Sequence, residues 1–277
     1  MSDLADNKDV KDAKDAKDAF SLDGKVVVLS GAAGIIGTQV VKSFVEAGAR
    51  VFAMDRDAGL LADRLGPVHD SLITCVADVA QRESLGAAHA LLVSRWGQAD
   101  GLLNNAATKS ENFFEPFETF PVDEWNEVMS VNLTGAMLCA QVFGSPMAQR
   151  GCGSIVNTLS IYGIVAPDQR IYEGSEYLGC AINTPAIYAA SKAGLWGLTK
   201  YLAAYWGHKG VRVNAVTPGG VFSGQNDTFV ENYSRRTPLG RMAQTDDMAN
   251  AMRYLTSDAA KYITGHNLVV DGGWTAW

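Results

Sequence analysis

The chain has 277 residues, of which 47% are hydrophobic and 19% are charged, a composition that suits one large α/β domain with a buried core. Its net charge of −7 gives no general attraction to nucleic acid or anionic lipid, because both favour basic surfaces. No apolar run approaches the roughly 20 residues needed to cross a bilayer, and the scattered cysteines and histidines show no metal-ligand spacing. We therefore expect a reduced, cytoplasmic protein without a metal, nucleic-acid or membrane partner.

Residues 1–19 form a tail of low complexity. From Lys8 the sequence reads Lys-Asp-Val and then Lys-Asp-Ala three times. Such a segment has almost nothing to bury, so we expect disorder or a frayed helix, with an interaction tail as the alternative. It lacks the apolar stretch of a signal peptide. The functional domain is expected to span residues 20–277.

Strand-like and helix-like segments alternate through the rest of the chain without a linker. Short apolar runs rich in β-branched residues predict strands at 25–30, 50–54, 72–77, 101–104, 154–159, 211–216 and 267–270. Helical patterns lie between them, notably at 35–47, 122–147 and 188–206. Continuous apolar strands separated by helices indicate a parallel sheet covered on both faces. We expect a single Rossmann-type, doubly wound α/β domain with about seven parallel strands, and ligands beyond their carboxyl ends.

A glycine cluster separates the first strand from the first helix. It places Gly31, Gly34 and Gly37 where the backbone can approach a pyrophosphate, and the helix N-terminus adds free N–H groups and a positive dipole. Glycines also make plain turns, but the strand before and the helix after favour a dinucleotide site.

Asp55 ends the second strand, 18 residues beyond Gly37. A carboxylate there accepts hydrogen bonds from the ribose hydroxyls of NAD and repels the 2′-phosphate of NADP. The structural alternatives are a helix cap and an ion pair with Arg56, which would also partly offset the repulsion.

Eight short motifs follow one another along the chain. They are the glycine turn, Asp78-Val79, Asn104-Asn105-Ala106-Ala107, Asn132 in Val131-Asn132-Leu133, Ser160, Tyr188-Ala-Ala-Ser-Lys192, Pro218-Gly219-Gly220 and Asp271-Gly272-Gly273. In this order they resemble the short-chain dehydrogenase/reductase superfamily, in its shorter single-domain branch. The resemblance covers nearly all of residues 20–277. A lone Tyr-x-x-x-Lys is a common accident on helices, but eight motifs in family order are specific.

The resemblance assigns roles to residues along the chain. For the cofactor it implies Ile36 at the pyrophosphate, Asp78 and Val79 at the adenine, Asn104 and Ala106 at the adenosine ribose, and Val221 and Ser223 at the nicotinamide carboxamide. For catalysis it implies Asn132, Ser160, Tyr188 and Lys192, with Tyr188 and Lys192 also beside the cofactor. It further implies a homotetramer.

Four departures from the family pattern stand out. The glycine turn reads GxxGxxG instead of GxxxGxG, a form commoner in longer relatives that epimerise or dehydrate sugar nucleotides, but the chain is too short for their added substrate domain. Ala107 replaces a glycine and Leu159 replaces a serine. Ser160 and Tyr188 are 28 residues apart, about twice the usual separation, so roughly fifteen residues are inserted within 161–187.

The inserted segment emerges beside the active site, because its ends are the catalytic Ser160 and Tyr188. It carries Arg170 and Tyr172, which are candidate substrate contacts. Arg170 would suit an acid group, which a guanidinium binds through two hydrogen bonds. The alternative is a solvated loop, since loops tolerate added length at little cost.

The Tyr188/Lys192 pair suits hydride-transfer chemistry. Free tyrosine, with a pKa near 10, is a poor base at neutral pH. Lys192 lies one helical turn away, and its ammonium together with the positive nicotinamide of NAD⁺ favours the phenolate, which brings the pKa of Tyr188 toward the working range. Ser160 can donate a hydrogen bond to the substrate oxygen, and the resemblance implies that Asn132 holds a water connecting Lys192 to solvent.

We therefore expect an NAD(H)-dependent oxidoreductase that interconverts a secondary alcohol and a ketone on a polar, sugar-like or sugar-acid-like small molecule. The inserted segment and the C-terminal Trp274-Thr275-Ala276-Trp277 look similar to dehydrogenases of sugar and surface-polysaccharide metabolism. One alternative is a 3-oxoacyl thioester reductase, which would normally use NADPH and a basic patch for an acyl carrier protein. Another is a cofactor-binding regulator without turnover.

Overall fold

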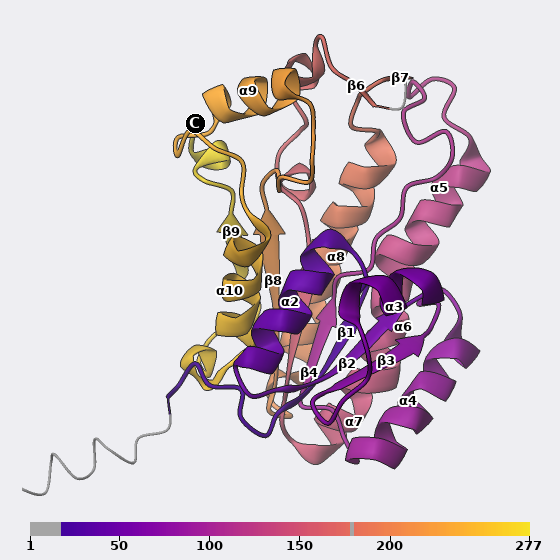
Figure 1. The fold of residues 1–277 in the computed structure, drawn as a ribbon, viewed down its shortest axis with the longest axis vertical. Helices are drawn as coiled ribbons and strands as arrows, with labels where there is room; N and C mark the ends of the chain where they lie inside the picture. Colours follow the sequence, from indigo (N-terminus) through magenta and orange to yellow (C-terminus); the bar gives the residue numbers. More distant parts are fainter. Residues whose placement is uncertain (1–17, 178–179) are drawn as a thin grey trace, which may run out of the picture.

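A parallel sheet forms the centre of the computed structural model, which describes residues 18–177 and 180–277. The strand order is β3-β2-β1-β4-β5-β8-β9, and every neighbouring pair is parallel (Figure 1). The strands are β1 (Val26–Ser30), β2 (Arg50–Asp55), β3 (Leu72–Val76), β4 (Gly101–Asn104), β5 (Gly153–Thr158), β8 (Val211–Pro218) and β9 (Asn267–Val270). The expected seven-stranded, doubly wound sheet is confirmed. The expected tail lies outside the described residues as far as Lys17.

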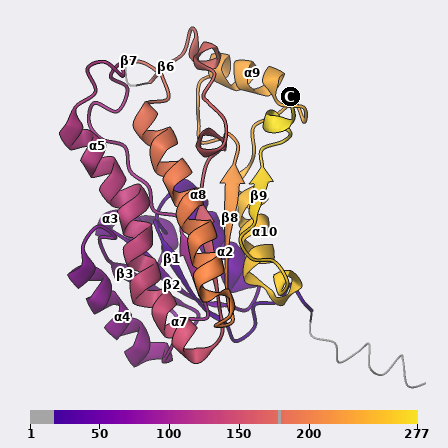
Figure 2. The ribbon, with the colours of Figure 1, turned by 180° about the vertical axis from the view of Figure 1, so that it is seen from behind.

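Helices cover both faces of the sheet (Figures 1 and 2). One face carries α2 (Ile35–Glu46), α3 (Ala58–Leu65) and α10 (Thr245–Thr256), which bury apolar side chains such as Phe44 and Met252. The other carries α4 (Arg82–Trp96), the stretch 122–150 and α8 (Ala186–Gly207), which bury Phe143 and Trp206. Both faces of the strands are therefore apolar, as the continuous hydrophobic runs predicted.

The stretch 122–150 is helical throughout but not uniformly α-helical. It consists of α5 (Val122–Met129), the π-helical turn η1 (Ser130–Gly135), α6 (Ala136–Cys139), a second π-helical turn η2 (Ala140–Gly144) and α7 (Ser145–Arg150). By length and composition it is apolar enough to cross a bilayer, so the expectation that no segment qualifies is corrected. Its packing on β4, β5 and α8 is what a core helix of a soluble domain also shows.

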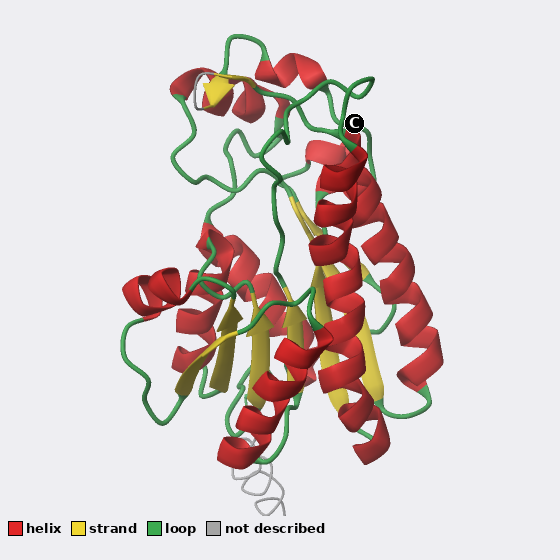
Figure 3. Cartoon of the chain, turned by 90° about the vertical axis from the view of Figure 1, so that its right-hand side faces the viewer, coloured by secondary structure: helices red, strands yellow, loops and turns green. Residues whose placement is uncertain are grey.

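Short elements gather beyond the carboxyl ends of the strands (Figure 3). They are η3 (Ile161–Gly163), η4 (Gln169–Tyr172), the antiparallel pair β6 (Glu176–Tyr177) and β7 (Cys180–Ala181), α9 (Asp227–Arg236) and η6 (Trp274–Ala276), while η5 (Asp258–Ala260) follows α10. The inserted segment 161–187 is thus built of turns and a strand pair, and it packs on α9. The amide of Asn232 donates to the backbone oxygens of Ile171 (3.4 Å) and Glu173 (3.3 Å).

Candidate active site

The glycine turn, which follows β1, packs closely against the loop that follows β4. Gly31 has φ +66°, and a Cβ on it would lie 2.7 Å from the Cα of Ala106. A Cβ on Gly37 would lie 2.2 Å from the oxygen of Gly31. These glycines are therefore required by close backbone approach. Ser30 closes the same junction, since its Oγ accepts from the backbone N–H groups of Asn105 (3.1 Å) and Ala106 (3.2 Å).

The N-terminus of α2 is open to a ligand. Gly34 is its N-cap and offers no side chain to bond the first-turn N–H groups, and that turn carries no acidic residue. Free N–H groups at a helix start suit an anion such as a pyrophosphate. Ile36, in the same turn, lines the cavity described below. The residues of this turn therefore fit a dinucleotide.

Asp55 lies at the end of β2 beside the glycine turn. Its Oδ2 accepts from the N–H of Ala33 (3.0 Å) and its Oδ1 from the N–H of Asp57 (3.2 Å), while Arg56 next to it is exposed. The helix-cap alternative for Asp55 does not hold. Asp57 caps α3, accepting from the N–H of Leu60 at 2.9 Å.

The other residues expected at the adenosine half differ in orientation. Asn104 is buried, and its amide donates to Oδ1 of Asn157 (2.8 Å), so its side chain joins β4 to β5. Asp78 accepts from the N–H of Ala80 (2.9 Å), and Val79 is buried against Gly135 of η1. Asp78 and Val79 thus follow β3 at the same edge of the sheet as Asp55.

A cavity of about 810 Å³ lies where β4, β5 and β8 end, and we call it the catalytic cavity. Ser160, Tyr188 and Lys192 all line it, together with Val221 and Ser223. Lys192 is 3% exposed; its Nζ donates to the backbone oxygen of Thr158 (2.8 Å) and lies 5.9 Å from the centre of the Tyr188 ring. The structure therefore brings together the three side chains that the sequence placed at the chemistry.

Asn132 braces the catalytic helix from the π-helical turn η1. Its Oδ1 accepts from the N–H of Thr108 (2.9 Å), and its amide donates to Oγ of Ser191 (3.2 Å), which lies between Tyr188 and Lys192 on α8. Asn132 is 1% exposed. A π-helical turn re-aims side chains relative to a regular helix and is frequent at functional sites. The sequence pattern did not reveal it.

Burial shifts the pKa values of both central groups. It lowers the pKa of Lys192 to about 8, which still leaves mostly ammonium at neutral pH. Burial also raises the pKa of Tyr188, and a hydrogen bond with Ser160 opposes that rise. Both directions describe the protein without its cofactor, so the expectation that the Lys192 ammonium and the positive nicotinamide together lower the pKa of Tyr188 stays a prediction.

The two residues proposed as substrate contacts are separated. The side chain of Arg170 is 80% exposed, does not line the catalytic cavity, and donates to both oxygens of Asp168 at 2.8 Å. Tyr172 does line the cavity. The sequence analysis missed other lining residues, including Lys109, Thr158, Tyr162 and Thr184. Thr158 and Tyr162 flank Ser160 in the sequence, which was an available signal, whereas no pattern singles out Thr184.

Comparisons with known proteins agree with this geometry. Residues 31–275 match a family model described as enoyl-(acyl carrier protein) reductase. A D-threitol dehydrogenase of Mycolicibacterium smegmatis is 34% identical over 92% of this chain and 95% of its own length.

Two solved structures share the fold over nearly the whole chain. A short-chain dehydrogenase from Leptospira borgpetersenii with bound NAD⁺ has a TM-score of 0.82 and 35% identity, covering 94% of this chain and 96% of its own. A gluconate 5-dehydrogenase from Burkholderia cenocepacia, in complex with NADP and tartrate, has a TM-score of 0.81 and 31% identity, covering 94% and 98%. The chain therefore belongs to the short-chain dehydrogenase/reductase family, the oxidoreductases that act on CH–OH groups and use a nicotinamide dinucleotide.

Proposed function

We propose that this chain is an NAD(H)-dependent dehydrogenase that interconverts a secondary alcohol and a ketone on a sugar-like small molecule. The observation that carries the proposal is the catalytic cavity, in which Ser160, Tyr188 and Lys192 line one space beside the glycine turn. A threitol dehydrogenase and a gluconate 5-dehydrogenase among the similar proteins support the substrate class.

The proposed chemistry is a proton transfer coupled to hydride transfer. When bound, oxidised dinucleotide supplies the hydride acceptor and a positive charge near Tyr188. The phenolate of Tyr188 takes the hydroxyl proton of the alcohol, and Ser160 donates a hydrogen bond to the same substrate oxygen. Lys192, held by Thr158, keeps a positive charge beside the phenol. Asn132 holds α8 in place through its hydrogen bond to Ser191, and it would also hold a water that relays the proton from Lys192 to solvent.

Asp55 supports a preference for NAD over NADP. Its carboxylate lies beside the glycine turn, where it can accept from ribose hydroxyls and would repel a 2′-phosphate. One of the two similar structures holds NAD⁺ and the other holds NADP, so the preference of this chain has to be argued from its own residues.

The alternatives receive less support. The matched family model is named for an acyl carrier protein reductase, but the net charge of −7 and Asp55 suit neither an acidic carrier protein nor NADPH. A regulator without turnover would not need Tyr188 and Lys192, and both are present in the cavity.

The test is NADH formation, followed by absorbance, with a panel of polyols, sugars and sugar acids. Tyr188→Phe should lower kcat by about a thousandfold or more while NADH still binds, because only the proton-transfer group is removed. Tyr262→Phe is the matched control, since that side chain is fully exposed just after η5 and does not line the catalytic cavity. Activity close to wild type in Tyr188→Phe would refute the proposed function.

We also propose that the enzyme works in the cytoplasm as a homo-oligomer, a tetramer by family resemblance. Large apolar side chains that remain exposed, including Phe117, Val122, Tyr201 and Tyr205, are the kind of surface that association buries. Light scattering of the purified protein gives the assembly directly.

A further inference from the structure

Three hydroxyl groups gather on one side of the catalytic cavity. They belong to Tyr162 in η3, Tyr172 in η4 and Thr184 in the segment before α8. Tyr162 lies two residues after Ser160, and Thr184 lies four residues before Tyr188. Short chain segments therefore connect Tyr162 and Thr184 to the residues that would hold the reacting oxygen, and all three hydroxyl-bearing residues line one cavity with Ser160 and Tyr188.

These hydroxyls form a connected set, which we call the hydroxyl triad. The hydroxyls of Tyr172 and Thr184 are 2.5 Å apart, and the hydroxyl of Tyr172 donates to that of Tyr162 at 3.3 Å. The ring of Tyr172 also stacks on Phe229 of α9, with 5.4 Å between ring centres. The triad is therefore held in place by both hydrogen bonds and packing.

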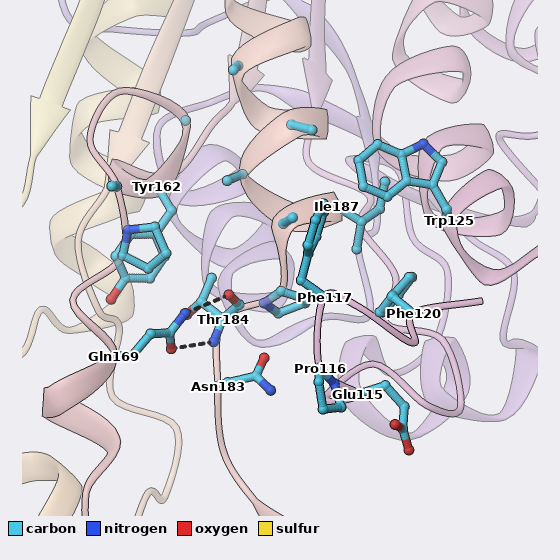
Figure 4. A pocket seen from close by; sticks show the side chains of 18 of the residues that line it. Glu115, Pro116, Phe117, Phe120, Trp125, Tyr162, Gln169, Asn183, Thr184 and Ile187 are labelled. Atoms are coloured by element: carbon cyan, nitrogen blue, oxygen red, sulfur yellow. Dashed lines mark hydrogen bonds between the residues drawn. The ribbon is translucent and has the colours of Figure 1, made fainter. Parts of the chain in front are cut away.

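Gln169 fixes the position of Thr184 (Figure 4). Its side-chain amide donates to the backbone oxygen of Thr184 (3.0 Å) and accepts from the backbone N–H of Thr184 (3.1 Å). A second, largely apolar cavity of about 880 Å³ lies next to Thr184 and is lined by Phe117, Trp125 and Ile187 among others. Thr184 thus lines both cavities, and the two hydrogen bonds with Gln169, which lines the second, fix the position of its backbone.

The triad offers more acceptors than donors. Each hydroxyl has one donor and two acceptor positions, and the two internal hydrogen bonds use two of the three donors. Four acceptor positions and one donor remain. Burial raises the pKa values of Tyr162 and Tyr172, so both phenols stay neutral. A neutral, acceptor-rich surface matches a ligand that brings O–H donors, whereas a carboxylate brings only acceptors.

The cations near the cavity give the competing possibility, a substrate carboxylate. Arg170 is excluded by its position, because it is exposed and paired with Asp168. Lys109 lines the catalytic cavity, and its Nζ lies 5.8 Å and 5.5 Å from the ring centres of Phe113 and Phe114. Glu176 lines the same cavity with the opposite charge. Lys192, the other cation of the lining, is held by the backbone oxygen of Thr158 beside Tyr188. A substrate carboxylate would therefore depend on Lys109, with Glu176 in the same lining, while the triad favours hydroxyls.

We propose that the hydroxyl triad of Tyr162, Tyr172 and Thr184 recognises the hydroxyl groups next to the reacting carbon of an uncharged polyol, with Gln169 as the positioning residue. This inference rests on the proposed function and narrows its substrate class from sugar-like compounds to neutral polyols.

The test compares D-threitol and a six-carbon polyol with D-gluconate. Wild type should show the higher kcat/KM with a polyol. Tyr172→Phe and Thr184→Val remove one hydroxyl each at nearly constant shape and should each raise KM for the polyol by about tenfold, the size of one lost hydrogen bond. The double variant should lose less than the product of the two, because the hydroxyls bond each other. NADH affinity should not change, and Tyr262→Phe, at a fully exposed ring, serves as the control.

The role of Gln169 as a positioning residue is tested by comparing the effect of its substitution on KM with the effect on kcat. Gln169→Glu removes the donor to the Thr184 oxygen and should raise KM for polyols with kcat nearly unchanged. Gln169→Ala, which leaves Thr184 without either hydrogen bond, should show the same split with a larger rise. Melting curves and NADH binding show whether each variant is folded.

A readout without turnover separates this inference from the proposed function. In Tyr188→Phe, calorimetry with NAD⁺ present should detect D-threitol binding that Tyr172→Phe weakens about tenfold. If wild type oxidises D-gluconate best and Lys109→Met abolishes that preference, the triad proposal is overturned while the dehydrogenase function stands. If D-threitol binds in the calorimeter but no alcohol is ever oxidised, the proposed function fails and the subsite stands. Unchanged KM and affinity in Tyr172→Phe and Thr184→Val also overturn the triad.

Discussion

At the scale of single residues, Lys192 is a buried cation whose cost to stability depends on pH. Its pKa falls from 10.5 to about 8 on burial. Between these values the unfolded chain binds more protons than the folded one, so the free energy of unfolding rises with pH. The burial penalty is fully present below pH 8 and is relieved as the pH approaches 10.5.

We predict that the difference in unfolding free energy between wild type and Lys192→Met shifts in favour of wild type by about 2 kcal/mol from pH 7.5 to pH 9.5. Urea unfolding of the cofactor-free proteins measures it. Lys261→Met, at an exposed lysine, is the control and should show no such shift. A pH-independent difference for Lys192→Met would mean that the ammonium is well solvated in the folded state.

Asp55 gives a second prediction at this scale. Asp55→Asn keeps an acceptor for the N–H of Ala33 but removes the charge, so it isolates electrostatic selection from the structure of the turn. We expect the ratio of kcat/KM for NAD to that for NADP to fall by about tenfold or more. Asp57→Asn is the matched control, because Asp57 caps α3 and should affect stability alone. An unmodified enzyme that uses both cofactors equally would contradict this role for Asp55.

At the scale of elements, the sequence predicted the strands well and the inserted segment poorly. The seven strands are apolar on both faces, so their hydrophobic runs mark them within one or two residues. The segment 161–187 has no such period, because its turns are fixed by particular contacts, such as Gln169 to Thr184 and Asn232 to Ile171. This also explains why the side chain of Tyr172 lines the cavity while that of Arg170 is exposed. The two residues lie two positions apart in the turn η4, which directs their side chains to different sides, and no sequence pattern encodes which side faces the cavity.

Asp168 links the inserted segment to α9. Its carboxylate, 14% exposed, accepts from Arg170 in the segment and from Arg236 in the helix. These bonds lower the pKa of Asp168 to about 2, chiefly through the hydrogen bond from Arg170. Because the folded pKa is depressed, the link is complete above about pH 4 and is lost only as the pH falls toward 2.

We predict that Asp168→Asn loosens the inserted segment. Amide hydrogen exchange in 169–175 should become several times faster, and KM for substrate should rise, while NADH affinity stays constant. Glu231→Gln removes an exposed pair with Arg235 on the same helix and should change neither quantity. If exchange in the segment is unaffected by Asp168→Asn, then the Asn232 hydrogen bonds and the Tyr172–Phe229 stack hold it without the carboxylate.

At the scale of the whole molecule, the first described residues contact the end of α10 and the turn that follows it. The backbone oxygen of Ala19 accepts from the N–H of Ala259 (2.9 Å), Arg253 donates to the oxygen of Phe20 (3.0 Å), and Leu22 is fully buried. The residues before these contacts are mostly Lys, Asp and Ala and bring little apolar surface to a core.

Two truncated proteins can therefore show at which residue the N-terminal segment begins to contribute to the stability of the domain. Deleting residues 1–17 should leave activity and Tm nearly unchanged, whereas deleting residues 1–22 removes a buried leucine and its neighbours. The loss of one buried leucine typically costs about 2–5 kcal/mol, which in a domain of this size lowers Tm by roughly 5 °C or more. Thermal melting and NADH formation by the two truncated proteins measure the difference. An equal loss in the shorter deletion would show that the Lys-Asp-Ala repeats dock on the body or on a neighbouring subunit.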